Sequence, residues 1–152
     1  SASLHLITKD IINLSRLELE RRAVALELDL AANGDAIMCQ SVQIQQVLLN
    51  LVINAIEAMG EITGPRTLKI SSYNPSQDRI RIEVADTGTG LSEEVIDKIF
   101  DSFYTTKPEG MGMGLTISHA IIKRHGGILS AENRPEGGSL FWFTLPLISS
   151  SF

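Results

Sequence analysis

Residues 86–90, Asp-Thr-Gly-Thr-Gly, directly follow a segment, 79–85, in which aliphatic and polar side chains alternate. Such alternation is typical of a strand with one buried face, so the Asp86 carboxylate is expected where that strand ends. Gly88 and Gly90 would let another molecule approach the backbone closely. A carboxylate placed there can accept a hydrogen bond from an exocyclic amine such as that of adenine. Alone, this motif is weak evidence for a binding site, but further motifs lie on both sides of it in the sequence.

Helical and extended patterns are mixed along the chain. Helices are expected at 4–22, 41–59, 93–100 and 115–125, and strands at 25–30, 37–40, 68–73, 79–85, 128–132 and 139–145. Ser41 is the expected N-cap of the second helix and Gly60 its stop. A length of 152 residues fits one domain. The mixed order, with a terminal hairpin, predicts an α+β fold, a two-layer α/β sandwich.

Composition excludes several classes of partner. The net charge of -5 without a basic block argues against a nucleic-acid partner. No unbroken apolar stretch is long enough to span a membrane, so no membrane contact by this domain is expected. Cys39 is the only cysteine, which rules out an internal disulfide and favours a reducing compartment. A cytoplasmic location is therefore expected, possible also within a membrane-anchored protein.

The expected helix 41–59 carries one polar stripe. Its members fall within about 80° of the helix circumference and are Gln43, Gln46, Asn50, Asn54 and Glu57. Asparagine is a mediocre helix former, and its amide is costly to bury unpaired. Two asparagines a turn apart therefore suggest oxygens aimed at one target, and Mg²⁺ prefers such ligands. The alternative is a solvated seam whose amides bond to neighbouring backbone.

A second glycine cluster, Gly110, Gly112 and Gly114, precedes Leu115, where a helix is expected to begin. Unpaired N–H groups and the helix dipole at such a point favour a phosphate. Lys107 could neutralise a terminal phosphate, although a solvated loop charge is the alternative. Neither glycine run is a dinucleotide fingerprint, and no P-loop motif occurs. The pattern indicates a nucleotide site of another design.

With these motifs the chain resembles the catalytic and ATP-binding domain of bacterial sensor histidine kinases. That domain shares the Bergerat fold with gyrase, the ninety-kilodalton heat-shock chaperone and the MutL ATPases. The resemblance covers roughly residues 14–147. Its motifs come in family order: an N box at 46–59, a G1 box at 86–91, an F box at 100–107 and a G2 box at 110–115. The sequences of residues 50–59 and 103–108 are similar to the corresponding segments of nitrogen- and oxygen-sensing kinases.

The resemblance implies a mixed, mostly antiparallel sheet covered on one face by about three helices, with a mobile ATP lid. The loop setting of Phe100 and Phe103 suggests that they anchor this lid, and the alternative is that both belong to the core. It implies ATP and Mg²⁺ as cofactors, with Asn54 as the metal ligand and Asn50, Asn54 and Lys107 as the catalytic set. The implied nucleotide contacts are Asn50, Asn54, Asp86, Gly88, Gly90, Leu91, Phe103, Thr105, Thr106, Lys107, Gly110, Gly112, Gly114 and Leu115.

Two departures refine this expectation. ATP-hydrolysing relatives carry a glutamate four residues before the metal asparagine, where this chain has Asn50. Without that carboxylate, the site is expected to donate a phosphoryl group rather than hydrolyse ATP, because positioning and charge stabilisation dominate such transfer. In one kinase subgroup a basic residue contacts phosphate at the position of Glu57, so that contact is not expected here.

The acceptor is expected to be a histidine on a separate dimerisation domain of the same protein, with a response regulator receiver domain as an indirect partner. His5, His119 and His125 lack the acidic neighbour of an acceptor, and His125 is expected to cap or pack a helix end. Residues 1–15 would be the linker or helix from that missing domain, with Ser1–Ser3 as a cut end, 16–148 the catalytic domain and 149–152 a disordered tail. The alternatives are an anti-sigma-type serine kinase and a nucleotide-binding pseudokinase.

Overall fold

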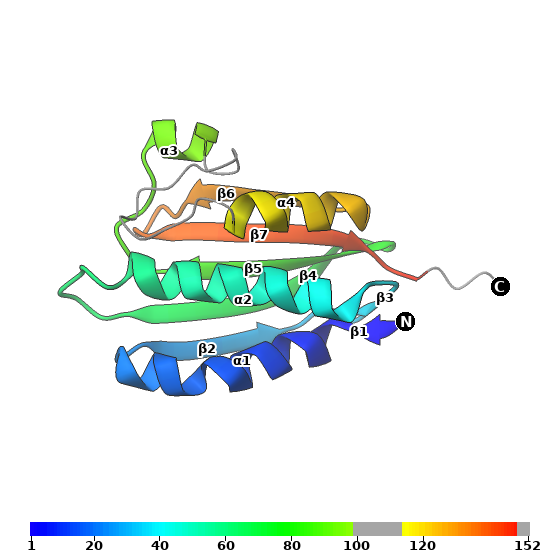
Figure 1. Ribbon diagram of the computed structural model, residues 1–152, viewed down its shortest axis with the longest axis horizontal. Helices are drawn as coiled ribbons and strands as arrows, with labels where there is room; N and C mark the ends of the chain where they lie inside the picture. Colours follow the sequence, from blue (N-terminus) through cyan, green and yellow to red (C-terminus); the bar gives the residue numbers. More distant parts are fainter. Residues whose placement is uncertain (99–113, 149–152) are drawn as a thin grey trace.

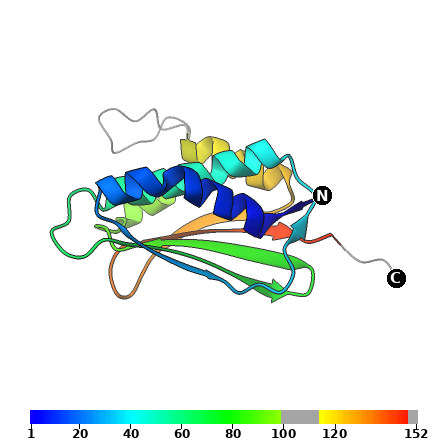
Figure 2. The same cartoon turned by 90° about the horizontal axis from the view of Figure 1, so that it is seen from below.

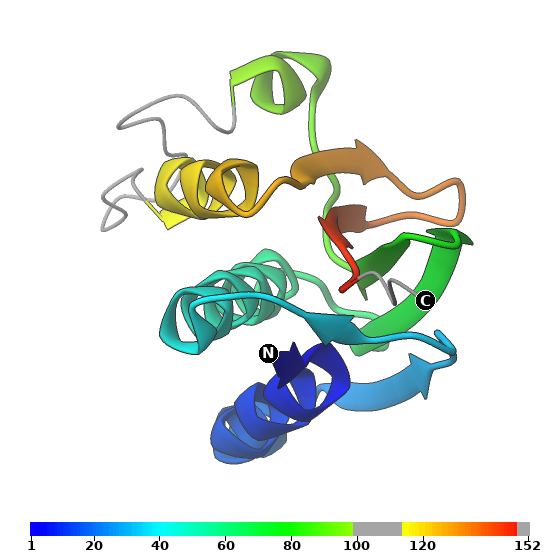
Figure 3. The same cartoon turned by 90° about the vertical axis from the view of Figure 1, so that its right-hand side faces the viewer.

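A computed structural model describes residues 1–98 and 114–148 (Figure 1). The elements, in chain order, are β1 (Ala2–Ser3), α1 (Leu4–Arg21), β2 (Ala25–Leu30), β3 (Ala36–Ile37), α2 (Ser41–Ala58), β4 (Thr67–Ser76), β5 (Arg79–Asp86), α3 (Glu93–Lys98), α4 (Gly114–Arg124), β6 (Ile128–Asn133) and β7 (Ser139–Pro146). Figures 2 and 3 show a layer of helices on one face of a sheet. The predicted two-layer α+β sandwich is therefore confirmed.

The sheet has five strands in the order β2-β4-β5-β7-β6. β2 pairs in parallel with β4, and the three other pairings are antiparallel, as the prediction of a mixed, mostly antiparallel sheet requires. β5 occupies the centre of the sheet. Its last residue, Asp86, pairs with Leu68 of β4, so the expected strand end carries the carboxylate as predicted.

The core lies between the helices and one face of the sheet. Along β5 the side chains of Ile80, Ile82 and Val84 are buried, and the residues between them are partly exposed. This period of two matches the alternation in the sequence and directs one face of the strand toward the helices. α1, α2 and α4 cover that face, and buried aliphatic residues from all three join the same core (Figure 3).

The N-terminal residues form an element that the sequence pattern did not predict. Ala2 and Ser3 form β1 and pair with Ile37 and Ala36 of β3. Ser3 also caps α1, since its side chain accepts a hydrogen bond from the Leu6 N–H. The strand expected at 37–40 is correspondingly shorter and earlier. Alternation cannot predict a two-residue bridge, because such a strand exists only through its tertiary partner.

The start of α2 also differs. Ser41 was the expected N-cap, but it is already helical, and Gln40 is the capping residue without a side-chain hydrogen bond to the helix. The backbone N–H of Gln40 instead donates to Nε2 of His125 at 3.1 Å. Nδ1 of His125 lies 2.8 Å from the Ile121 carbonyl, so it must donate. His125 thus packs the end of α4 against the start of α2, in keeping with its expected structural role.

Asp35 holds the beginning of α1 and makes stability depend on pH. Burial alone would raise the pKa of Asp35, but hydrogen bonds from the Ser3 side chain and the His5 N–H, with the charge of the His5 ring, lower that pKa below its ordinary 3.8. A lowered folded-state pKa adds stability above the unfolded-state pKa, and this stability is lost as pH falls through the folded-state pKa.

We therefore expect the free energy of unfolding to fall more steeply in the wild type than in Asp35→Asn as the pH drops from about 5 to 2. Urea unfolding at several pH values measures this slope. Equal slopes in the two proteins would contradict the proposed role of the Asp35 carboxylate.

Across residues 1–98 and 114–148, no helix combines the length and apolarity needed to cross a bilayer.

Candidate functional site

The site is built around the Asp86 carboxylate at the end of β5. Oδ1 accepts hydrogen bonds from the backbone N–H groups of Gly88 (2.8 Å) and Ser139 (3.3 Å), and Oδ2 accepts from the Ser139 hydroxyl (2.6 Å). Asp86 is completely buried, so a ligand must displace part of its cover to reach it. Oδ2 retains a second lone pair that can accept from an amine. These contacts fix the carboxylate before any ligand arrives.

The turn between β6 and β7 closes over the same strand end. Gly138 has φ +84°, and a Cβ there would lie 2.0 Å from the Asp86 carbonyl oxygen, so only glycine fits. The Arg134 guanidinium donates to that same carbonyl at 2.8 Å. The sequence pattern predicts a terminal hairpin here and indicates no role for Arg134, Gly138 or Ser139. The signal present was the Gly-Gly-Ser run of 137–139 at the start of a strand.

Gly88 brings the loop after β5 against the C-terminal end of α2. A Cβ on Gly88 would lie 2.5 Å from the Ala58 carbonyl oxygen. The protein's own backbone thus lies close to this glycine, and the approach of another molecule to it stays a prediction. Thr87 is used structurally: its hydroxyl donates to the Pro65 carbonyl at 3.0 Å and accepts from the Thr67 N–H at 3.0 Å. This packing joins the loop after β5 to α2, the helix that carries Asn50 and Asn54.

The polar stripe of α2 is only partly buried, and the aliphatic residues on the opposite side fill the core. Asn50 and Asn54 are both half-buried, one turn apart. The exposed surface of this helix is wider than the predicted seam, because Val42 and Ile53 are 76% and 43% exposed. The helix therefore buries one side only, and its asparagines lie along the border of the other.

Asn50 contacts the beginning of α4. Its Nδ2 donates to the Gly114 carbonyl (3.3 Å) and to the Ser118 hydroxyl (3.2 Å), and Ser118 is fully buried. The structure thus brings together Asn50 and Gly114, two predicted site residues 64 positions apart. Ser118 was missed by sequence reasoning, since a serine inside a helix gives no signal of its partner.

Leu91 and Gly90 lie against Asn133 at the end of β6. The Leu91 N–H donates to Asn133 Oδ1 at 2.7 Å, and Asn133 Nδ2 donates back to the Leu91 carbonyl. Gly90 has φ +80°. Leu91 and Leu115 are partly buried and pack on the core. These residues shape the border of the site through backbone and apolar contacts.

Several expected features fall outside the described residues. The lid anchor Phe100, the end of the helix expected to reach it, and the tail 149–152 are among them. So are six expected nucleotide contacts: Phe103, Thr105, Thr106, Lys107, Gly110 and Gly112. For these residues the roles stay predictions.

The donors present fit a magnesium nucleotide. Among the residues that the structure describes, no group of three or more His, Cys, Asp or Glu side chains could hold a metal by itself. Mg²⁺ commonly keeps several waters and shares its remaining positions with substrate phosphates, so one or two protein oxygens suffice. The half-buried amides of Asn50 and Asn54 are hard oxygen donors of this kind. The buried Asp86 carboxylate has a remaining lone pair of the kind that an exocyclic amine could meet.

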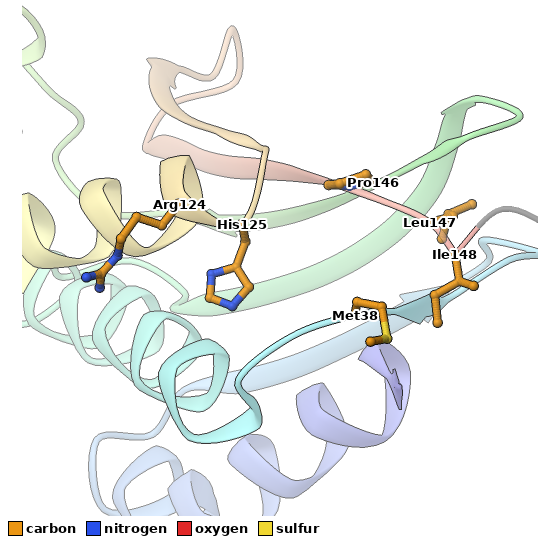
Figure 4. Close-up of a pocket in the computed structure, with 6 residues that line it drawn as sticks. All are labelled: Met38, Arg124, His125, Pro146, Leu147 and Ile148. Atoms are coloured by element: carbon orange, nitrogen blue, oxygen red, sulfur yellow. The ribbon is translucent and has the colours of Figure 1, made fainter.

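A hollow lies at the other end of the sheet (Figure 4). It has a volume of about 290 Å³ and is lined by Met38, Arg124, His125, Pro146, Leu147 and Ile148. Pro146 pairs with Arg79, at the end of β5 opposite to Asp86. None of the predicted site residues lines this hollow.

Residues 39–149 match the family described as histidine kinase-, DNA gyrase B-, and HSP90-like ATPase. The chain belongs to this family. Among its relatives in the family, the sensor protein FixL of Bradyrhizobium diazoefficiens is 46% identical over 123 residues, 81% of this chain and 24% of FixL. The sensor protein TdiS of Thauera aromatica is 38% identical over 143 residues, 93% of this chain and 26% of TdiS. The chain thus spans about a quarter of these curated relatives.

Solved structures of the family confirm the fold. The catalytic domain of the histidine kinase ThkA superposes with a TM-score of 0.83 at 34% identity, over 95% of this chain and 94% of that one. ThkA in complex with the response regulator TrrA gives a TM-score of 0.82 at 30% identity, over 97% of this chain and 41% of that one. The resemblance to histidine kinase catalytic domains is therefore confirmed, and the Bergerat architecture with it.

Proposed function

We propose that this chain binds Mg²⁺-ATP and donates the γ-phosphoryl group to a histidine on a separate dimerisation domain of the same protein. The observation that carries the proposal is the buried Asp86 carboxylate, fixed at the end of the central strand beside the asparagine face of α2. Membership of the histidine kinase-, gyrase B- and HSP90-like ATPase family and 46% identity to FixL support it.

Each residue has a distinct part in the proposed reaction. Asp86 Oδ2 accepts a hydrogen bond from the adenine amine and so selects the base. Asn54 ligates the metal, and Asn50 lies beside it near the phosphates. Bound Mg²⁺ supplies charge neutralisation at the phosphate oxygens. Lys107, Thr105, Thr106 and the amides around Gly112 are proposed to contact the nucleotide tail, with Phe103 anchoring that segment.

Transfer is favoured over hydrolysis because α2 offers no base at Asn50. An amide cannot take a proton from water, and the Nδ2 side of this amide is already engaged by Gly114 and Ser118. The nucleophile would therefore come from another domain. We expect the isolated chain to bind ATP and to turn it over negligibly.

The partners follow from the same proposal. The acceptor hairpin would precede this domain and connect to it through residues 1–15, of which Leu4, Ile7, Ile11 and Ile12 pack in the core formed with residues 16–148. A receiver domain would take the phosphoryl group afterwards. The ThkA complex with the response regulator TrrA gives a precedent in a structural relative. A cytoplasmic location suits both ATP and receiver domains.

Mixing the chain with ATP, Mg²⁺ and the dimerisation domain of the same protein tests the proposal. We expect an acid-labile, alkali-stable phosphoryl group on the acceptor histidine. We expect Asn54→Ala to lower the transfer rate roughly a hundredfold, because without this ligand the metal and the phosphate that it holds are positioned less well. Gln46→Ala, an exposed change on the same polar stripe, is the matched control and should transfer at the wild-type rate.

Two other outcomes identify the alternatives. Transfer to a serine-bearing antagonist protein but not to the hairpin would establish the anti-sigma-type kinase. ATP binding with transfer to neither acceptor would establish the pseudokinase.

A further inference from the structure

We infer that Ser118 is a positioning residue for Asn50: its buried hydroxyl, with the Gly114 carbonyl, holds the Asn50 amide so that its oxygen is directed away from α4 and toward the metal and phosphates. This inference rests on the proposed function and names a residue of α4 that controls the Mg²⁺-dependent part of nucleotide binding.

The orientation of the Asn50 amide follows from its partners. A carbonyl oxygen can only accept, so the atom of Asn50 that faces Gly114 must be the NH₂ group. The same nitrogen lies 3.2 Å from the Ser118 hydroxyl, which accepts its second proton. Both of these partners bind Nδ2. Within 1–98 and 114–148, no hydrogen bond to the Oδ1 atom of Asn50 is found. Two acceptors on one side therefore leave the carbonyl end of the amide for a different partner.

Ser118 is suited to this task by its burial. Its exposed fraction is 0%, and a hydroxyl inside the protein costs free energy unless it is hydrogen-bonded. The bond to Asn50 meets that requirement for the serine and at the same time restrains the χ2 angle of the asparagine. If Ser118 were removed, the amide would keep one acceptor and gain freedom to rotate, so its oxygen would be less well placed.

The contact also links two parts of the site. Gly114 is the first residue of α4 and the last glycine of the cluster that sequence reasoning assigned to phosphate binding. Asn50 stands one turn from the proposed metal ligand Asn54 on α2. The Asn50–Ser118 bond thus fixes the phosphate end of α4 relative to the metal end of α2.

Calorimetry of Ser118→Ala tests the inference by separating base binding from metal-dependent binding. The first readout is the affinity for ADP in EDTA. The second is the factor by which Mg²⁺ raises the affinity for ATP, called the magnesium factor below. Loss of an outer partner at a metal site typically costs roughly 10–100-fold. Because Asn50 lies beside the proposed ligand Asn54 rather than being the ligand, we expect the lower end of that range: a roughly tenfold fall in the magnesium factor, with ADP affinity in EDTA within about twofold of wild type. Ser118→Thr keeps the hydroxyl and should restore the magnesium factor.

Ser15→Ala is the matched control. Ser15 is a buried helical serine whose hydroxyl donates to the Ile11 carbonyl at 2.9 Å on α1, away from the site, so its loss should leave the magnesium factor unchanged. Thermal unfolding of each variant corrects for any loss of folded protein. A side-chain amide NMR signal of Asn50 that moves in Ser118→Ala but not in Ser15→Ala reports the contact without nucleotide.

The outcomes separate the two claims. A wild-type magnesium factor that persists in Ser118→Ala, or an Asn50 amide signal that does not move, overturns the role of Ser118 and leaves the proposed function intact. A wild type that binds ATP equally with and without Mg²⁺ overturns the proposed function and the inference together. A factor lost in Ser118→Ala, regained in Ser118→Thr and kept in Ser15→Ala supports both.

Discussion

Replacing Gly138 by alanine is expected to lower the free energy of unfolding by about 4 kcal/mol or more, and the midpoint of thermal unfolding by roughly 10 °C. The new Cβ would lie 2.0 Å from the Asp86 carbonyl oxygen and 2.9 Å from the Thr87 Cα, both backbone atoms that no rotamer change can move. The positive φ of +84° adds strain for any L side chain. Relief requires the β6–β7 turn to withdraw from the end of β5.

That withdrawal would also open the site. Ser139 follows Gly138 and supplies two of the three hydrogen bonds to the Asp86 carboxylate. We therefore expect Gly138→Ala to weaken nucleotide binding even at temperatures where the protein remains folded. Calorimetric unfolding and ATP titration of one sample measure both effects.

The neighbouring glycine gives a sharp control. Gly137 has φ +106°, but a Cβ on it would meet nothing within 4 Å, so Gly137→Ala carries the backbone strain without the collision. We expect it to cost only about 1 kcal/mol. Similar unfolding midpoints for the two variants would show that the turn does not pack on Asp86 as described.

The second large effect is expected from Asp86→Asn. The change keeps the volume of the side chain, and Asn Oδ1 can still accept from the Gly88 and Ser139 N–H groups. Its NH₂ group would then replace Oδ2, facing the Ser139 hydroxyl, which can accept. The fold should therefore survive, but the position proposed to accept the adenine amine becomes a donor.

We expect ATP affinity to fall roughly a hundredfold, which corresponds to about 3 kcal/mol and to the loss of a hydrogen bond to a charged group. Inosine triphosphate carries a carbonyl oxygen where adenine carries the amine, so it should bind the variant better than ATP. Calorimetry with the two nucleotides measures this reversal. An unchanged preference for ATP would remove Asp86 from base recognition.

The periodic patterns of apolar residues made much of this fold predictable from the sequence. The alternation of 79–85 gave β5 and placed Asp86 at its end, and the apolar side of 41–59 gave α2 with its asparagines at the border of the core. These elements are long, and their periods of 2 and 3.6 residues are clear. The order of the four motifs then identified the class of domain, although six of the predicted contacts lie outside the described residues.

What the sequence could not supply were contacts between distant segments. β1 exists only because Ala2–Ser3 meet Ala36–Ile37, and the N–H of Gln40, the N-cap of α2, binds His125 just beyond the end of α4. Ser139 and Ser118 were missed for the same reason, since their importance lies in partners 53 and 68 residues away. A hydroxyl in a strand or helix has no local signature that reveals such a partner.

The central position of β5 has a consequence for how the domain responds to heat and mutation. Edge strands such as β2 and β6 can fray in local fluctuations, whereas an inner strand paired on both sides separates only when the whole domain unfolds. Because Asp86 ends that inner strand, we expect the proposed recognition of the base to rest on a strand whose amides exchange more slowly than those of β2 and β6. Destabilising changes elsewhere should thus leave affinity intact until the melting transition itself.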